Sequence, residues 1–211
     1  MENKKISTAV IRRLPRYYRF LTDLLCEGVC RISSDELSRR MRMTASQIRQ
    51  DLNNFGGFGQ QGYGYNVENL KNEIGKLLGL DKSHGLVIIG AGNIGKALAG
   101  YSNFEGQGFA VSALFDIDQN LIGKTVRGAR IMHVDMFEAF MEYSDASIAV
   151  IAVPRDAAQQ TAELICRCGI KAIWNFAHVD LVLPEDVAVE NVHLSESLMQ
   201  LSYSLNFAGS L

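Results

Sequence analysis

The chain has 211 residues, 47% of them hydrophobic and 21% charged, a composition typical of a globular protein of one large or two small domains and not of a disordered chain. No apolar run reaches the roughly 18 residues that a membrane helix needs, and the N-terminal segment lacks an export signal, so we expect a cytoplasmic protein with reduced cysteines. The net charge of −2 conceals a basic segment, because residues 1–60 hold 11 Lys and Arg against six Asp and Glu; this balance is typical of a module that contacts a polyanion, although a solvated basic helix face explains it equally well.

Three short helices are expected near the N-terminus. Residues 13–26 place apolar side chains at helical spacing. Ser33 and Thr44 each stand before a further apolar stripe with Glu or Gln three residues later, which is the pattern of a capping box. Only residues 42–43 separate the second helix from the third, so the segment predicts a helix-turn-helix.

The stretch NFGGFGQQGYGYN, residues 54–66, alternates glycines with aromatic residues. It predicts two short strands joined by a turn, with Phe58, Tyr63 and Tyr65 packed at their base. A hairpin directly after a recognition helix is a wing. An amphipathic helix follows from Val67, and we place the domain boundary near residues 81–84.

From Leu86 onward strands alternate with helices. The strands are continuous apolar runs, which indicates a parallel sheet covered on both faces. We expect strands at 86–90, 109–118, 147–154, 170–176 and 187–192, and helices at 93–101 and 155–169. A last helix, from Leu194, has a leucine stripe but no sheet of its own to pack on. The predicted fold class is α/β: a winged-helix domain, a Rossmann-like parallel-sheet domain and a C-terminal helix.

A dinucleotide fingerprint follows the first of these strands. In Gly90-x-Gly92-x-x-Gly95, the glycines permit a tight turn, a close approach to a pyrophosphate and packing of the helix on the strand. Asp116 ends the next strand, 21 residues after Gly95, where a carboxylate accepts ribose hydroxyls and repels a 2′-phosphate. We therefore expect NAD(H), held by Gly90, Ala91, Gly92, Asn93, Ile94, Gly95 and Asp116.

Other residues are candidates by position alone. His133, Val153 and Pro154 lie at the ends of later strands, where they would border the ribose and nicotinamide, and Phe176 lies at the end of the strand at 170–176. Each also has an ordinary structural interpretation: a hydrogen-bonded histidine, a proline that ends a strand, and a core phenylalanine.

The sequence lacks the groups that an oxidoreductase needs beside its nucleotide. Such an enzyme requires a second region for substrate and a positioned acid or base, whereas residues 85–193 suffice for the nucleotide fold alone. The four histidines form no constellation with Lys or Glu, and the four cysteines lack partners at metal-ligand spacing. We therefore expect neither catalysis nor a metal site.

Several stretches together resemble one family. The Rex family of bacterial redox-sensing transcriptional repressors shares, in the same order, TASQIRQDLNNFGGFGQQGYGYNVENL, GAGNIGKALAGY, FDID, AVPRDAAQ, IKAIWNFAHVDL and VAVENVHL. The resemblance runs from about residue 7 to the C-terminus. It implies a homodimeric repressor that binds a palindromic, AT-rich double-stranded operator and is released when NADH binds, so that it senses the NADH/NAD⁺ ratio.

The resemblance also implies three domains and their contacts. Residues 1–81 form the winged-helix domain, 82–193 the Rossmann-like NAD(H)-binding domain, and 194–211 a helix exchanged between subunits. DNA contacts are assigned to Arg12, Arg16, Thr44, Ser46, Gln47, Arg49, Gln50 and Gln61. Arg49 is the best candidate for a base edge or phosphate, with an ion pair to Asp51 or Glu36 as the alternative.

Redox sensing follows from the charge of the nicotinamide ring. Both redox forms share every atom that the glycine turn and Asp116 hold, but only the oxidised ring is charged. A dry pocket made of Phe176, Pro154 and Leu194 of the partner subunit therefore favours the neutral, reduced ring. If that pocket forms only when the subunits close, the difference in affinity shifts the dimer toward the closed state.

The chain departs from the family pattern at three positions. Gln50 replaces a lysine of many relatives, and Gln61 stands where the wing often carries a basic residue. His193 stands where relatives have an aspartate that pairs with the switch residues Arg19 and Tyr101. We hypothesise that closure uses another pair here or is sensitive to pH.

Three other functions remain open on the sequence. A small NAD-dependent oxidoreductase would oxidise NADH with a carbonyl substrate. A regulator that binds CoA or another nucleotide would be separated by competition binding. A purely architectural DNA binder would have no use for Asp116 and the glycines.

Overall fold

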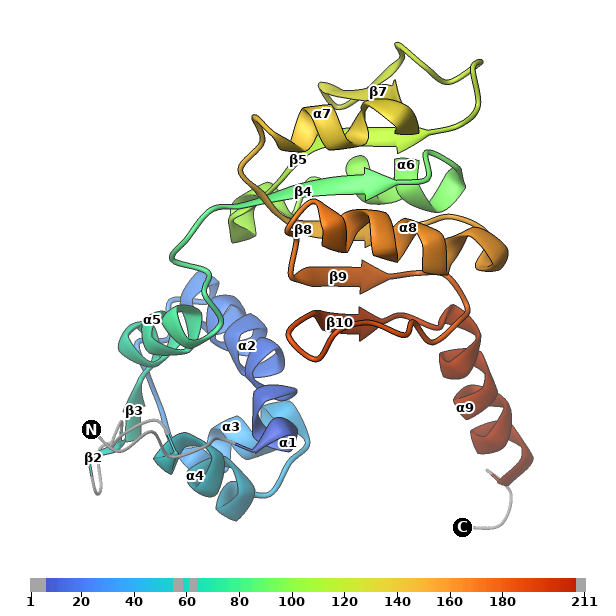
Figure 1. Cartoon of the computed structure of the whole chain (residues 1–211). Coiled ribbons are helices and arrows are strands. Elements are labelled where there is room, and N and C mark those ends of the chain that lie inside the picture. Colours follow the sequence, from blue (N-terminus) through green and yellow to red (C-terminus); the bar gives the residue numbers. More distant parts are fainter. Residues whose placement is uncertain (1–6, 55–58, 61–63, 208–211) are drawn as a thin grey trace. The chain divides into compact units, whose positions relative to one another are not determined.

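A computed structural model of the chain describes residues 7–54, 59–60 and 64–207. The chain divides into two compact units, Met1–Lys82 and Ser83–Leu211, which hold separate cores (Figure 1). No helix in the described ranges is long and apolar enough to cross a membrane.

The N-terminal unit is a helix-turn-helix with a small antiparallel sheet. Its elements are α1 (Thr8–Ile11), α2 (Leu14–Cys26), β1 (Arg31–Ile32), α3 (Ser34–Met41), α4 (Ala45–Asn53), β2 (Gly59–Gln60), β3 (Gly64–Asn66) and α5 (Val67–Leu77). The strands lie in the order β1-β3-β2. The expected wing is thus present as β2 and β3, with β1 paired to it; α1 was not predicted.

Local sequence explains where the two helices of the motif begin. The side chains of Ser33 and Thr44 accept hydrogen bonds from the backbone N–H groups three residues later, at 3.1 and 3.2 Å. Arg42, with a φ of 52°, ends α3 in the left-handed region, which makes the two-residue link to α4 possible. Both predicted caps are confirmed.

The core of this unit joins all its larger helices. Tyr17, Leu21 and Leu24 of α2 are fully buried against residues of α3, α4 and α5. Tyr65 of β3 packs at the edge of the same core, as expected for the base of the wing. Phe58 and Tyr63, predicted to pack there as well, lie outside the described residues.

The C-terminal unit is built on a seven-stranded sheet in the order β10-β9-β8-β4-β5-β7-β6. The strands are β4 (His84–Ile89), β5 (Phe109–Asp116), β6 (Thr125–Val126), β7 (Ala129–His133), β8 (Ala146–Ile151), β9 (Ala172–Asn175) and β10 (Ala188–Asn191). All pairs are parallel except β6 with β7. Strand order reverses beside β4, so the carboxyl ends of β4 and β8 form the switch point where such sheets bind ligands.

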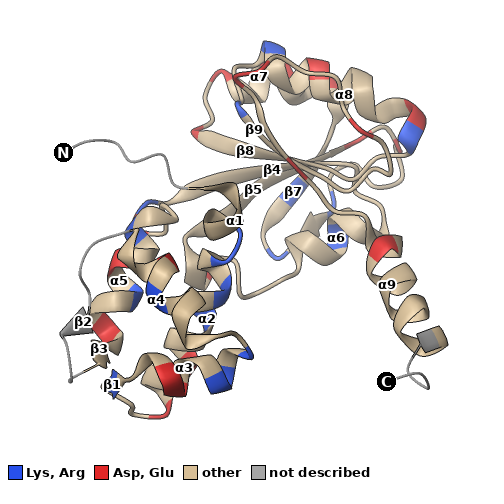
Figure 2. Cartoon of the chain, turned by 90° about the horizontal axis from the view of Figure 1, so that it is seen from below, with Lys and Arg blue, Asp and Glu red and all other residues tan. Residues whose placement is uncertain are grey.

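Helices lie on both faces of this sheet. α7 (Phe137–Met141) and α8 (Arg155–Arg167) cover one face, and α6 (Asn93–Ala99) covers the other (Figures 1 and 2). Short 3₁₀ turns, η1 (Glu105–Gln107) and η2 (Val134–Met136), complete the connections. α9 (Leu194–Phe207) stands away from the sheet in both views. β6, β7 and α7 were not predicted from the sequence.

Candidate nucleotide site and nucleic-acid interface

The three glycines of the fingerprint meet different surroundings. Gly90 has a φ of +100°, and a Cβ there would overlap the carbonyl of Ala152 at the end of β8. A Cβ on Gly95 would overlap the carbonyl oxygen of Gly90, so this glycine lets α6 pack against the turn. A Cβ on Gly92, by contrast, would meet no atom of the described residues within 4 Å beyond its own chain neighbours. The protein itself therefore requires Gly90 and Gly95, whereas the space at Gly92 is open to a ligand.

Asp116 lies beside this turn. One carboxylate oxygen accepts a hydrogen bond from the backbone N–H of Ala91, and the other accepts one from the N–H of Asp118 at 2.9 Å. The side chain is half-buried and forms part of a cavity wall. It is thus placed between the glycine turn and solvent, where further hydrogen-bond donors can reach it.

A cavity of about 410 Å³ opens at the switch point. It brings together the predicted residues Gly90, Gly92, Asp116, Val153 and Pro154. Other residues of the wall were not predicted as site residues, among them Ile117, Val134, Ala157, Gln160, Thr161, Leu164 and Arg167. Most of them come from one face of α8, where positions 157, 160–161 and 164 recur at helical spacing; that period was the available signal.

The remaining nucleotide candidates lie elsewhere. His133 ends β7, where its Nδ1 accepts from the N–H of Asp135 at 3.3 Å; its neighbour Val134, not His133, lines the cavity. Phe176 follows β9 and packs against Trp174, with ring centroids 4.7 Å apart, in the cluster on the α6 side of the sheet. Leu194 begins α9 and is 60% exposed. The cavity therefore gathers only part of the predicted set.

The three switch candidates have distinct environments. Arg19 lies on α2 and is exposed, with its guanidinium near the ring of Phe20. Tyr101 follows α6, is half exposed and accepts a hydrogen bond from Asn103. His193 precedes α9. The centroid of its ring lies 4.9 Å from the centroid of the His178 ring, in an edge-to-face arrangement. Its buried Nδ1 has no partner among the described residues.

Five of the predicted DNA contacts, Thr44, Ser46, Gln47, Arg49 and Gln50, lie on α4 or at its N-cap. Lys and Arg residues of this unit occur on α2, α3, α4 and α5, interspersed with acidic groups (Figure 2). Thr44 and Ser46 are exposed and hydrogen-bonded to each other at 3.2 Å, and Gln50 is exposed. Arg49 donates to Ser34 at 2.8 Å and lies 3.9 Å from the carboxylate of Asp35, a different pairing from the two alternatives expected.

The other predicted DNA contacts differ in whether their side chains are already hydrogen-bonded within the protein. Arg12 is exposed at the end of α1. Arg16 donates to the carbonyl of Met41, at the end of α3, and so ties α2 to the turn of the motif. Gln61 lies outside the described residues.

A buried carboxylate stands behind the recognition helix. Asp51 of α4 is fully buried, and its two oxygens accept from Nε and Nη2 of Arg13, each at 2.7 Å. They also accept from the hydroxyl of Tyr17 at 3.0 Å and from Nε2 of Gln47 at 2.7 Å. Burial alone would raise the pKa of Asp51, but these hydrogen bonds outweigh it and hold the pKa below its ordinary value.

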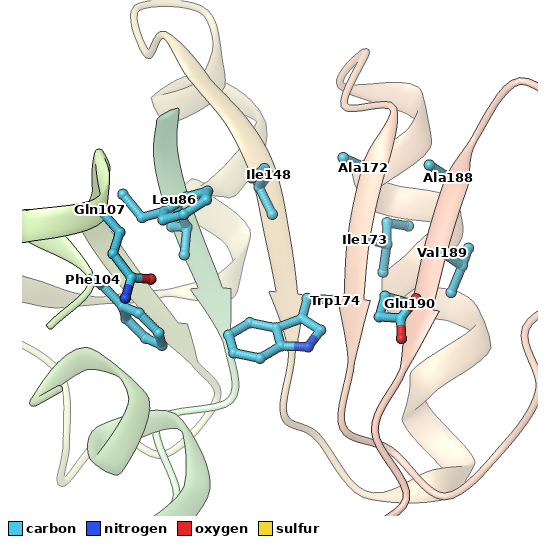
Figure 3. Close-up of a pocket in the computed structure, with 11 residues that line it drawn as sticks. Leu86, Phe104, Gln107, Ile148, Ala172, Ile173, Trp174, Ala188, Val189 and Glu190 are labelled. Atoms are coloured by element: carbon cyan, nitrogen blue, oxygen red, sulfur yellow. The ribbon is translucent and has the colours of Figure 1, made fainter. Parts of the chain in front are cut away.

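An apolar groove lies on the α6 side of the sheet. It has a volume of about 400 Å³ and is lined chiefly by hydrophobic residues of five strands, with Phe104 and Trp174 among them (Figure 3). Trp174 reaches across the strands toward Phe104, with ring centroids 5.8 Å apart. Apolar side chains of α9 are also exposed, among them Leu198 (67%), Leu201 (61%) and Leu205 (79%).

The chain matches two family models. Residues 5–53 match a model described as a putative DNA-binding protein N-terminus, and residues 81–179 match one described as a CoA binding domain.

Full-length relatives share one name. The redox-sensing transcriptional repressor Rex of Thermoanaerobacter pseudethanolicus is 56% identical over 202 residues, which cover 96% of this chain and 90% of the relative. The protein of the same name from Clostridioides difficile is 54% identical over 201 residues, which cover 95% and 96%.

Two solved structures are similar throughout. A crystal structure of RSP in complex with β-NAD⁺ and operator DNA superposes with a TM-score of 0.92 at 55% identity, covering 98% of this chain and 95% of that one. RSP in complex with β-NADH gives a TM-score of 0.90 at 52% identity, covering 98% and 97%.

Proposed function

The chain belongs to the Rex family of redox-sensing transcriptional repressors, and from this membership we propose that it represses transcription as a homodimer whose hold on operator DNA responds to the NADH/NAD⁺ ratio. The observation that carries the proposal is that one chain joins a capped helix-turn-helix with a wing to a sheet whose switch point opens at Gly92 and Asp116. The relatives' structures with both redox forms of the cofactor and with operator DNA support it.

The residues at the switch point fit a dinucleotide. The open space at Gly92 accommodates a pyrophosphate against the start of α6, where backbone N–H groups and the helix dipole favour an anion. Asp116 would accept the ribose hydroxyls and repel a 2′-phosphate. The apolar side chains of the wall, Ile117, Val134, Ala157 and Leu164, suit an adenine ring.

Redox discrimination requires a second, drier region. When bound, the cofactor supplies a nicotinamide ring that is charged if oxidised and neutral if reduced. Pro154 precedes α8 and lines the cavity, and Phe176 lies beyond β9, on the side of the switch point where the other half of a dinucleotide extends. Apolar side chains at this position disfavour an unpaired positive charge, so we expect them to bind the reduced ring more tightly.

The groove and α9 together suggest how the dimer is built. α9 starts three residues after β10 ends yet stands away from its own sheet, with its leucines exposed. The groove on the α6 side of the sheet, around Phe104 and Trp174, is apolar and of a size to receive side chains of a helix. We assign as its occupant α9 of a second copy, an exchange of identical elements that buries both surfaces. Leu194 would then approach the partner's nicotinamide pocket.

DNA binding falls to the N-terminal unit. Thr44 caps α4, whose first turn carries Ser46 and Gln47, with Arg49 and Gln50 following, and recognition helices read base edges with such residues. A dimer with two such helices calls for a palindromic site, and we expect an AT-rich one. Because a repressor works at the DNA, we place the protein in the cytoplasm.

A regulatory role without catalysis fits the residues around the cavity. Its wall carries Asp116 and Arg167 as charged groups, the rest being apolar or neutral. Asp116 is engaged by two backbone N–H groups, and Arg167 lies 3.6 Å from the carboxylate of Glu138. Neither is placed as a proton donor, so we propose that the nucleotide is read and not consumed.

The decisive experiment starts from the protein bound to a fluorescent, AT-rich palindromic duplex. NADH or NAD⁺ is added in increasing amounts, and fluorescence anisotropy measures how much DNA stays bound. We expect NADH to release the DNA and NAD⁺ not to do so. Arg49→Ala should abolish DNA binding, whereas Gly92→Val should bind DNA and ignore NADH. Equal affinity for both redox forms, or continued binding to DNA at saturating NADH, would contradict the proposal.

Three further measurements test the alternative functions and the role of His193. The match of residues 81–179 to a CoA binding domain model makes CoA the competitor to test against NADH in direct binding. Oxidation of NADH with a carbonyl substrate would instead identify an oxidoreductase. NADH-driven release compared at about pH 6 and about pH 8 tests the role of His193, and identical curves exclude a pH-sensitive closure.

A further inference from the structure

The side-chain amide of Gln47 is held in one orientation. Its Nε2 lies 2.7 Å from Oδ1 of Asp51, one turn further along α4. An ionised carboxylate only accepts hydrogen bonds, so the atom of the amide that faces Asp51 has to be the nitrogen. Chemistry thereby fixes which end of the amide points inward.

Asp51 is itself unable to turn. Arg13 grips both of its oxygens through Nε and Nη2, and Tyr17 donates to Oδ2. Arg13 immediately precedes α2 and Tyr17 lies within it, 38 and 34 residues away from Asp51 in sequence, and Asp51 is fully buried. The carboxylate is therefore a fixed acceptor on the buried face of α4.

The other end of the amide points away from this anchor. Gln47 is the third residue of α4 and is half-buried, and its carbonyl oxygen has no partner among the described residues. Asp51 uses one of the two protons on Nε2. One N–H donor and one C=O acceptor remain side by side, which is the arrangement that complements N7 and the N6 amino group of adenine in the major groove.

We propose that Asp51 is a positioning residue that locks Gln47 to read an adenine in each operator half-site. This inference rests on the proposed function, because it takes α4 as the recognition helix. Without the lock, a glutamine amide can rotate and present its nitrogen and oxygen in either order. Removal of that freedom makes the contact selective before DNA arrives.

The first test selects binding sites from a randomised duplex library by the full-length protein and by Gln47→Ala. We expect the wild type to enrich a palindrome with an adenine at one position of each half-site, and Gln47→Ala to lose the preference at that position alone. In wild-type protein, replacement of this adenine by 7-deazaadenine, which lacks N7, or by purine, which lacks the amino group, should weaken binding about tenfold. Gln47→Ala should not respond to either replacement.

The second test separates positioning from stability. Asp51→Asn offers Gln47 a side-chain amide that can donate as well as accept, so we expect its preference to spread from adenine toward guanine, whose N7 and O6 only accept. Tyr17→Phe is the matched control: it removes one hydrogen bond from Oδ2 and leaves the contact with Gln47 in place. It should lower thermal stability and keep the base preference.

The outcomes distinguish the two proposals. If the wild type enriches a palindrome and Gln47→Ala enriches the same one, the inference is wrong and the proposed function stands. If the wild type enriches no sequence, both the adenine contact and the proposed function are wrong. If Tyr17→Phe alters base preference as Asp51→Asn does, Asp51 acts through stability alone and the positioning role is overturned; an unfolded Asp51→Asn leaves the decision to Gln47→Ala and the modified bases.

Discussion

Two aspartates, one in each unit, show how differently the same side chain is used. Asp51 is fully buried and accepts hydrogen bonds from three side chains, and its surroundings hold its pKa below the ordinary value. Asp116 is half-buried at a cavity, and the hydrogen bonds it accepts come from backbone N–H groups. The closed surroundings of Asp51 suit the structural and orienting role that we propose for it. The open surroundings of Asp116 leave it free to bind a ligand.

The contrast extends to the two regions around them. The N-terminal unit packs α2, α3, α4 and α5 about one core, and its polar anchor lies inside. The C-terminal unit has an open cavity at the switch point, an apolar groove on its sheet and an exposed helix. A region completed by its own residues suits the DNA-binding role that we propose for it, and a region that leaves surfaces uncovered suits the proposed regulation by a ligand and a partner.

The largest expected effect is on stability, and it tests the contrast between Asp51 and Asp116 directly. Asp51→Ala leaves the guanidinium of Arg13 without its buried partner, so we expect the free energy of unfolding to fall by about 3 kcal/mol. Asp116→Ala should change it by less than about 1 kcal/mol and instead weaken NADH binding. Urea denaturation followed by circular dichroism measures both variants, and equal losses would show that the two aspartates do not differ in this way.

The glycines provide a second contrast within the C-terminal unit. Gly95→Ala forces a methyl group into the carbonyl of Gly90, so we expect a loss of about 2 kcal/mol in unfolding free energy. Gly92→Ala meets no neighbouring atom and should leave stability within about 0.5 kcal/mol. Calorimetric titration should nevertheless show a weaker affinity of Gly92→Ala for NADH. A stability loss at Gly92 as large as at Gly95 would contradict a ligand-based requirement.

A charged substitution on α9 tests whether its exposed leucines form the dimer interface. Leu201→Glu places a carboxylate on the leucine stripe of α9, and we expect the dimer dissociation constant to rise at least tenfold, about 1.4 kcal/mol. Gln200→Glu adds the same charge on another face of the helix and should leave the constant unchanged. Sedimentation equilibrium measures both, and identical behaviour of the two variants would exclude this stripe from the interface.

The smallest expected effect is a pH dependence. Because the folded pKa of Asp51 lies below its unfolded value, its contribution to stability is present above about pH 4 and is lost as the pH falls through the folded pKa. Wild-type protein should therefore lose more stability than Asp51→Asn between about pH 5 and about pH 3. Parallel curves for the two proteins would mean that the hydrogen bonds at Asp51 do not shift its titration.

Features that depend on neighbouring residues were predictable from the sequence. Ser33 and Thr44 cap their helices as expected, because a cap joins residues three apart. The glycine turn and Asp116 were found for a similar reason, since the fingerprint lies within one strand-turn-helix segment and the carboxylate ends the next strand. The short strands β6 and β7 and the five-residue α7 escaped prediction, since so few residues carry too little periodicity.

The sequence alone determined the two-unit plan, the helix-turn-helix with its wing and the nucleotide turn, because these follow from local hydrogen bonding and hydrophobic period. Only the tertiary structure decided which distant residues meet. It brought Arg13 and Tyr17 onto Asp51, placed Thr161 and Leu164 of α8 in the cavity wall, and put Phe176 in the cluster on the other side of the sheet. Such contacts join segments far apart in the chain, and packing, which no local pattern encodes, selects them.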